Sequence, residues 1–141
     1  MEKLDYHFSV DGENFTTAGE ASVQVKKLLR QIGFPQDVIR RVSVAMYEGE
    51  INMVIHAHGG DADVLIDENK ITVLLSDRGP GIPDISLAMQ EGYSTAPDNI
   101  RSLGFGAGMG LPNMKRYSDD MTVESEVGVG TVIKMEFNVS K

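Results

Sequence analysis

The sequence predicts an α+β fold, in which a mixed, mostly antiparallel sheet carries helices on one of its faces. Two observations predict it. Short stretches in which apolar and polar residues alternate, as in half-buried strands, occur near both ends and in the middle of the chain. Two stretches with helical spacing follow one another with no strand between them. Consecutive helices and consecutive hairpins favour a two-layer sandwich of this kind.

The first half of the chain predicts one strand and two helices. Alternating apolar residues over 6–10 indicate the strand. Thr17 stands three residues before Glu20, the spacing of a capping box, so a helix is expected to begin there. Gly33 suits the end of that helix. Pro35 suits the first turn of a second helix, which its apolar spacing extends to about residue 56.

The second half predicts two hairpins, two short helices and a long loop. The expected segments are a strand at 64–66, a turn at 67–70, a strand at 71–75, a helix at 84–91, a loop at 92–109, a helix at 111–117, and strands at 121–127 and 133–137 joined by a turn at 128–130. Loops as long as 92–109 are usually functional or disordered.

Composition limits the classes of function. The 141 residues fit one domain, 1–141, that can bury a core. Thirteen Lys and Arg against 21 Asp and Glu argue against an electrostatic nucleic-acid binder or a polybasic membrane surface. The absence of cysteine excludes disulfides, thiol catalysis and cysteine-ligated zinc. No apolar run approaches the roughly 20 residues of a membrane span, so a cytoplasmic domain is expected.

The first candidate motif pairs Glu48 with Asn52 on one face of the second helix, one turn apart. An Asn carbonyl is a hard ligand that suits Mg²⁺, and a Glu can accept a proton from a hydroxyl or water. Taken alone, the pair is more typical of a solvated helix face. Gly49 between them costs about 1 kcal/mol of helix stability relative to Ala. A close neighbour, either a strand or a ligand, is therefore expected beside it.

The second candidate motif begins with Asp77, where a strand ends, and continues through Gly79 and Gly81. A carboxylate in this place can accept a hydrogen bond from an exocyclic amine. The glycines allow the backbone to approach a planar ring closely. An ordinary tight turn is the alternative interpretation.

Two further glycine motifs follow. Alternate glycines over 104–110 leave N–H groups free to face anionic oxygens, and the helix that follows adds the partial positive charge of its N-terminus. A flexible loop is the alternative there. The last motif, Gly128-Val129-Gly130-Thr131, is by itself a hairpin turn.

Together and in this order, the four motifs resemble those of the GHKL ATP-binding superfamily, which includes gyrase, Hsp90, histidine kinases and MutL. The matches are Glu48-x-x-x-Asn52 to its N-box, Asp77-x-Gly79-x-Gly81 to its G1 box, Gly104 to Gly110 to its G2 box, and Gly128-x-Gly130-Thr131 to its last box. The resemblance covers about residues 5–139 and implies a Bergerat-type ATP-binding fold.

Within the superfamily, the chain is most similar to the small stand-alone branch of bacterial anti-sigma factors and switch-protein serine kinases. The stretches 77–85, 91–95 and 108–116 carry this similarity, and they are most similar to the stress-pathway switch kinase. Because 141 residues suffice for this one domain, the dimerisation helices and the phosphoacceptor domain of a histidine kinase are not expected.

The resemblance implies roles for individual residues. Glu48 would be the general base, Asn52 would hold Mg²⁺ on the phosphates, and Asp77 would bind the adenine amine of ATP. Arg101, in an ATP lid over about 92–109, would reach the terminal phosphate. Further nucleotide contacts would come from Gly79, Gly81, Ile82, Thr95, Gly104, Gly106, Gly108, Met109, Gly110, Leu111 and Thr131. A second carboxylate, Glu50, points about 200° around the helix from Glu48, so Glu48 is the expected base.

Three functions follow as hypotheses. The first is an Mg-ATP-dependent serine/threonine kinase that phosphorylates a small antagonist protein of the STAS type. The second is a nucleotide-dependent module that binds a sigma factor or another regulator, and a basic partner would suit the acidic chain. The third is an ATPase switch without a protein substrate. A homodimer is plausible, whereas partnership with nucleic acid or membrane is not expected.

Overall fold

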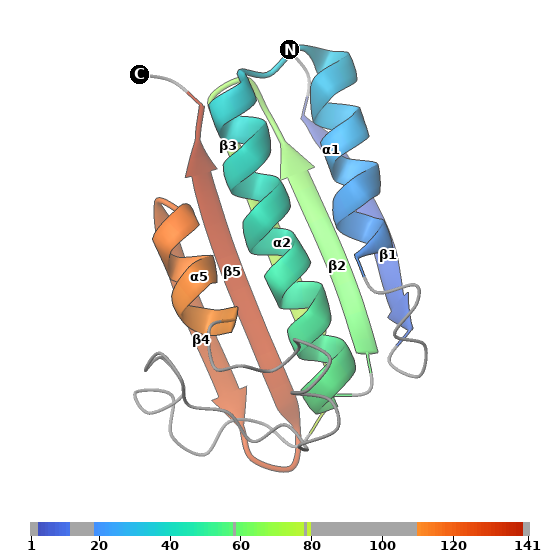
Figure 1. Cartoon of the computed structure of the whole chain (residues 1–141). Helices are drawn as coiled ribbons and strands as arrows, with labels where there is room; N and C mark the ends of the chain where they lie inside the picture. The colour runs from blue at the N-terminus through green and yellow to red at the C-terminus, as the bar shows by residue number, and fades with distance from the viewer. Residues whose placement is uncertain (1–2, 12–18, 58, 78, 80–109, 140–141) are drawn as a thin grey trace.

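The computed structural model describes residues 3–11, 19–57, 59–77, 79 and 110–139 (Figure 1). The elements in these ranges are β1 (Leu4–Asp11), α1 (Glu20–Ile32), α2 (Gln36–Ala57), β2 (Gly59–Ile66), β3 (Lys70–Asp77), α5 (Gly110–Tyr117), β4 (Asp120–Glu126) and β5 (Gly130–Asn138). The helix expected at 84–91 and the lid at 92–109 lie outside the described residues.

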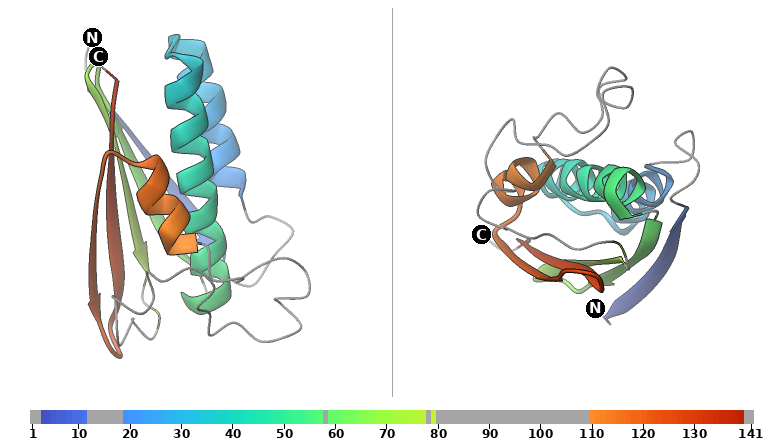
Figure 2. Two further views of the ribbon diagram at one scale, coloured as in Figure 1. Left: turned by 60° about the vertical axis from the view of Figure 1, so that its left-hand side comes forward. Right: turned by 90° about the horizontal axis from the view of Figure 1, so that it is seen from below.

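The strands form one five-stranded sheet in the order β1-β2-β3-β5-β4. Every pairing among them is antiparallel, and the register pairs Ile66 with Ile71 in the β2–β3 hairpin. Figure 2 shows α1, α2 and α5 on one side of the sheet, and no helix of the described residues lies on its other face. The expected α+β sandwich is therefore confirmed, with a wholly antiparallel sheet in the described part.

The core lies between the sheet and the helices. Alternate residues of the central strands turn inward, and the apolar stripe of α2 faces them. Fully buried side chains come from the three helices α1, α2 and α5 and from the three central strands β2, β3 and β5, among them Leu29, Val42, Met46, Val64, Ile71, Val73, Met114, Met135 and Phe137. The apolar residues that alternate along the strands, and those that recur at helical spacing, are thus the residues buried between the two layers.

Most predicted boundaries agree with the structure, but the starts of α1 and β2 do not. β2 begins at Gly59, five residues before the strand predicted at 64–66, because its pairing with β1 extends to that glycine. Gly33 ends α1 with φ of 100°, and its N–H donates to the Leu29 carbonyl. Pro35 directly precedes α2, and its carbonyl accepts the N–H of Ile39. The predicted capping box is wrong, because Gly19 is the N-cap of α1 and Glu20 is the first helical residue. The N-cap residue itself supplies no side-chain hydrogen bond.

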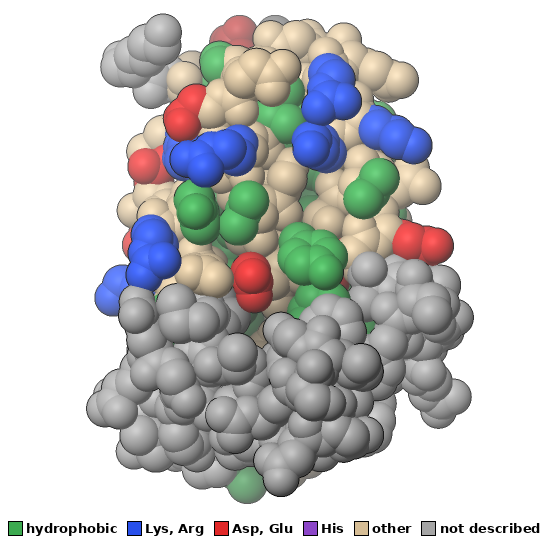
Figure 3. Space-filling view, viewed as in Figure 1, with side chains coloured by type: hydrophobic (Ala, Val, Ile, Leu, Met, Phe, Trp, Pro, Cys, Tyr) green, Lys and Arg blue, Asp and Glu red, His purple; other side chains and the backbone are tan. Residues whose placement is uncertain are grey.

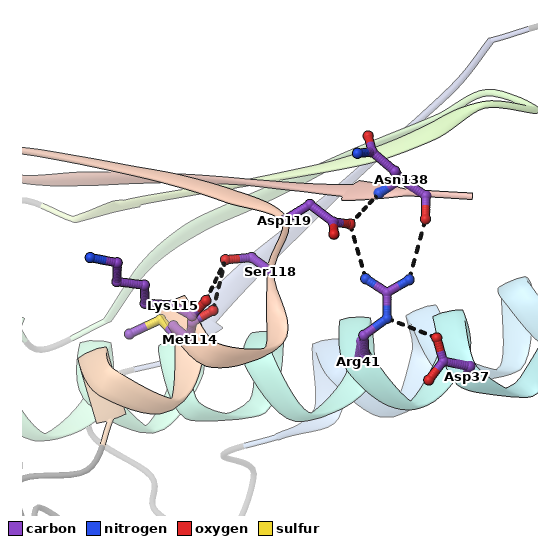
Figure 4. Close-up of polar contacts among 7 residues, drawn as sticks. All are labelled: Asp37, Arg41, Met114, Lys115, Ser118, Asp119 and Asn138. Atoms are coloured by element: carbon purple, nitrogen blue, oxygen red, sulfur yellow. Dashed lines mark hydrogen bonds and ion pairs between the residues drawn. The ribbon is translucent and has the colours of Figure 1, made fainter. Parts of the chain in front are cut away.

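The N-terminal half of α2 is tied to the sheet through Arg41 (Figure 4). Its guanidinium bonds to Asp37 on the same helix and to Asp119 beside β4, each at 3.0 Å, and to the Asn138 carbonyl at 3.2 Å. Asp119 also accepts the Asn138 N–H at 2.6 Å. One half-buried cation therefore joins the helix layer to the ends of β4 and β5.

None of the helices in the described ranges is both long enough and apolar enough to cross a membrane.

Candidate functional site

The ends of four elements that carry candidate residues meet at one end of the molecule. The C-terminal ends of α2 and β3 and the N-terminal ends of α5 and β5 all lie at the lower end in Figure 1. The antiparallel pairing of β3 with β5 brings the last residue of β3 beside the first residues of β5. Chain segments far apart in sequence therefore contribute side chains to one place.

Asp77 is held at this end by two backbone N–H groups. Gly79 N–H donates to its Oδ1 at 2.9 Å, and Thr131 N–H donates to the same oxygen at 3.1 Å. Among the residues that the structure describes, Oδ2 accepts no hydrogen bond. A carboxylate anchored through one oxygen is oriented without losing the acceptor capacity of the other, which can take an amine donor.

Thr131 is buried beside Asp77 and is the second residue of β5. Its hydroxyl lies 2.8 Å from the Ser125 hydroxyl on β4, the residue paired with it across the two strands. The structure therefore brings together three residues from two motifs, Asp77, Gly79 and Thr131, that are separated by more than fifty positions in the sequence.

Glu48 lies half-buried on α2, where α5 packs against that helix. Burial raises the pKa of Glu48, while a hydrogen bond with the Asn113 side chain acts in the opposite direction. A raised pKa brings a carboxylate closer to neutral pH, which suits a general base. The contact with Asn113 is absent from the sequence analysis, since no local pattern connects the two helices.

Gly49 packs closely against both β3 and α5. A Cβ there would overlap Cδ1 of Leu75 on β3 and stand 3.3 Å from the sulfur of Met114 on α5. The close neighbour expected beside this glycine is therefore a strand, with α5 added to it. Gly49 lets α2 approach the sheet at the turn that carries Glu48.

Glu50 has a structural role, the capping of α1, that the sequence analysis missed. Only 2% of it is exposed. Its carboxylate accepts the N–H groups of Gly19, Ala21 and Ser22, at 2.5 to 3.2 Å, and thus caps α1 from another helix. Burial raises the pKa of Glu50, and these hydrogen bonds oppose the shift.

A signal for the burial of Glu50 is present in the sequence. Glu50 stands four residues after Met46 and three before Met53, and both methionines are buried. That spacing places the carboxylate in the apolar stripe of α2. A charge in such a stripe needs partners. The first N–H groups of α1, which have no acceptor within their own helix, supply them.

Asn52 lies one turn beyond Glu48 and is partly exposed. Gly110 and Leu111 begin α5, and Leu111 is buried. The remaining candidates lie outside the described residues. They are Gly81, Ile82, Thr95, Arg101, Gly104, Gly106, Gly108 and Met109.

Comparison with known proteins defines the class. Residues 14–137 match the family described as the histidine kinase-like ATPase domain. The chain therefore belongs to this family, and its resemblance to GHKL proteins is confirmed.

Similar proteins place it in the regulatory branch. The anti-sigma F factor of Clostridium beijerinckii is 36% identical, over 97% of this chain and 96% of that protein. The serine/threonine-protein kinase RsbT of Bacillus subtilis is 31% identical, over 77% of this chain and 79% of that protein. Both the anti-sigma factors and the switch kinases of the expected branch are thus represented.

A solved structure agrees with the fold. The crystal structure of the RsbU and RsbW domains of a Mycobacterium tuberculosis protein superposes with a TM-score of 0.64 at 16% identity. The match covers 98% of this chain and 33% of that one. At this identity the likeness concerns the fold alone.

Proposed function

We propose that this chain is a partner-switching regulator that binds Mg-ATP and transfers phosphate to a serine or threonine of a STAS-type antagonist protein. One observation carries the proposal. Asp77, anchored by Gly79 and Thr131, lies at the same end of the fold as the half of α2 that carries Glu48 and Asn52. That arrangement supports an adenine contact and a phosphate contact in one site.

The side chains fit a nucleotide with a divalent cation. The remaining oxygen of Asp77 is an acceptor for the exocyclic amine of adenine. The side-chain carbonyl oxygen of Asn52 is a ligand of the kind that Mg²⁺ takes together with phosphate oxygens and water. When bound, the cation would neutralise charge that develops on the phosphates.

The protein's own contribution to the transfer would come from Glu48. Its raised pKa makes it a stronger base than an ordinary glutamate, so it would accept the proton of the attacking hydroxyl. Asn113 would orient that carboxylate through their hydrogen bond. Glu50 would not compete for the role, because its oxygens are committed to the start of α1.

Anti-sigma binding is the second candidate function. It is supported by the proteins named anti-sigma F factor, which match almost the whole chain. The two activities are compatible, since a nucleotide site can set the affinity for one partner while it modifies another. An ATPase switch without a protein substrate is the third possibility that the experiment must separate.

Nucleotide binding is tested by thermal unfolding with and without Mg-ATP. Ligand at about 100 times its dissociation constant stabilises a protein by roughly 2.7 kcal/mol, which is several degrees for a chain of this size. We expect this shift in the wild type and its loss in Asn52→Ala and Asp77→Asn. An unchanged melting temperature in folded wild type would contradict the proposed site.

Transfer is then measured with radiolabelled ATP and a STAS-domain protein from the same genome. Glu48→Gln should retain the thermal shift and lose most of the transfer, because it keeps a polar side chain and removes the base. Steady ATP hydrolysis without labelled protein would favour the ATPase switch. Nucleotide-dependent recovery of a sigma factor, again without transfer, would favour the binding module.

A further inference from the structure

An open groove lies between α1 and α2, on the side of the helix layer that faces away from the sheet. It has a volume of about 390 Å³. Its lining comes from the C-terminal half of α1 and the N-terminal half of α2, and consists of Lys26, Arg30, Gln36, Asp37, Ile39, Arg40, Ser43 and Val44. This region is separate from the candidate nucleotide site, which involves the opposite end of α2.

The groove is electropositive. Lys26, Arg30 and Arg40 are exposed in its wall, and none of the three has an ion-pair partner among the residues that the structure describes. The lining has one carboxylate, Asp37, which pairs at 3.0 Å with Arg41, a cation that it shares with Asp119. The three cations of the groove therefore remain available to an anionic partner.

This local charge is opposite to that of the whole chain. Residues 26–44 contain five Lys and Arg against one Asp, whereas the chain as a whole has a net charge of −8. Figure 3 shows Lys and Arg side chains gathered on the upper half of the helix-covered face. A basic partner is what the net charge alone predicts, but this face would repel it.

The groove also offers apolar contact. Buried Ile39 and partly buried Val44 contribute to its lining. On the same helices, exposed Tyr47 lies one turn beyond Val44, and exposed Val23 lies one turn before Lys26. Figure 3 shows apolar side chains in the middle of this face. Arg40 stands 5.6 Å from the ring of Tyr117 on α5, which helps to fix its guanidinium at the rim.

We propose that this groove docks an acidic amphipathic segment of a protein partner, with its apolar side chains on the Ile39 and Val44 floor and its carboxylates on Lys26, Arg30 and Arg40. Apolar lining beside the cations favours a protein segment over the uniform phosphates of nucleic acid. The strongly acidic remainder of the chain disfavours both a nucleic acid and an anionic membrane, since each would extend beyond the small basic area. The inference does not rest on nucleotide binding or phosphotransfer.

The test uses a fluorescein-labelled amphipathic peptide made of Glu and Leu, with fluorescence anisotropy as the readout. Wild type should bind it at low salt, and added salt should weaken the binding. The double variant K26E/R30E should raise the dissociation constant about tenfold or more. The control is Lys134→Glu, which reverses one cation, half the charge change of the double variant, on β5 at an exposed residue between inward-facing Ile133 and Met135. It should change the constant less than about twofold.

Several outcomes would overturn the proposal. These are failure of the wild type to bind the peptide, an unchanged constant in K26E/R30E, or an equal loss in Lys134→Glu. Tighter binding of phosphatidylserine vesicles or of duplex DNA through Lys26 and Arg30 would also reject a protein segment as the occupant. The Mg-ATP thermal shift separates this result from the nucleotide proposal. K26E/R30E should retain that shift, whereas Asn52→Ala should lose it and still bind the peptide.

Discussion

The two halves of α2 follow different rules. Over residues 36–46 the charged side chains are at the surface or, like Arg41, in ion pairs at its edge, and the inward face is apolar. Over 47–57 the same helix contains a glycine pressed against a strand and two carboxylates withdrawn from water. In the second half, where α2 packs against α1, α5 and β3 at the candidate site, the sequence contains residues that are unfavourable inside a helix or in its buried face, a glycine and two carboxylates. Departures of this kind are expected at functional positions.

Glu48 and Glu50 are two residues apart in the second half of α2, yet they contact different groups. Glu50 holds three N–H groups of α1, whereas Glu48 has Asn113 as its partner. The first is therefore expected to be structural and the second chemical.

Glu50→Ala should have the largest effect on stability. It removes a buried acceptor and leaves the first N–H groups of α1 without a partner, which should cost about 3 kcal/mol of unfolding free energy. Urea denaturation measures the loss, and Glu50→Gln should retain part of the stability. Glu48→Gln is the matched control, with an expected change below about 0.5 kcal/mol. Equal losses at both positions would remove the distinction.

The stability that depends on Glu50 should also vary with pH. The folded state raises the pKa of this carboxyl above its ordinary value of 4.5. Its titration therefore favours the folded state most below that ordinary value, and this contribution is lost as pH rises through the folded pKa. Because glutamine does not titrate, the advantage of wild type over Glu50→Gln should shrink over this range. An advantage that grew with pH would contradict the raised pKa.

Gly49→Ala should have the next largest effect. The added Cβ would overlap Leu75, which is buried and has little space to move. Overpacking of a core costs about 1–3 kcal/mol, and the better helix propensity of Ala returns up to about 1 kcal/mol. We expect a net loss of about 1–2 kcal/mol in urea denaturation.

A second substitution shows whether that loss comes from steric overlap. Leu75→Val shortens the side chain that the new Cβ would strike. The loss of unfolding free energy in the double variant should therefore be smaller than the sum of the losses in the two single variants, which a double-mutant cycle measures. Full additivity would place the cause elsewhere.

Arg41→Ala should have the smallest of these effects, about 1 kcal/mol. The substitution removes the link from α2 to Asp119 and to the Asn138 carbonyl (Figure 4), but water can partly replace these half-exposed contacts. Arg40→Ala is the control, because that exposed guanidinium has the Tyr117 ring as its contact. A larger loss in Arg40→Ala would show that the N-terminal half of α2 is held through α5 instead.

Much of the fold could be predicted from local patterns. The β2–β3 hairpin, the end of α1 at Gly33 and the course of α2 follow from alternation, a glycine stop and helical spacing, all of which act between near neighbours in the chain. The start of α1 could not be predicted in this way. Thr17 and Glu20 have a local capping pattern, but the cap comes from Glu50, some thirty residues later.

The order of the elements, the inward faces of the strands and helices, and the motifs of an ATPase family can all be predicted before the structure is known, because they depend on the types and spacing of residues along the chain. The packing of the elements adds what that pattern does not contain: the N–H groups of α1 that hold the buried Glu50, the strand that leaves no room for a side chain at Gly49, and a basic groove on an acidic protein. Each of these depends on which elements pack together, since burial and local charge are properties of neighbours in space.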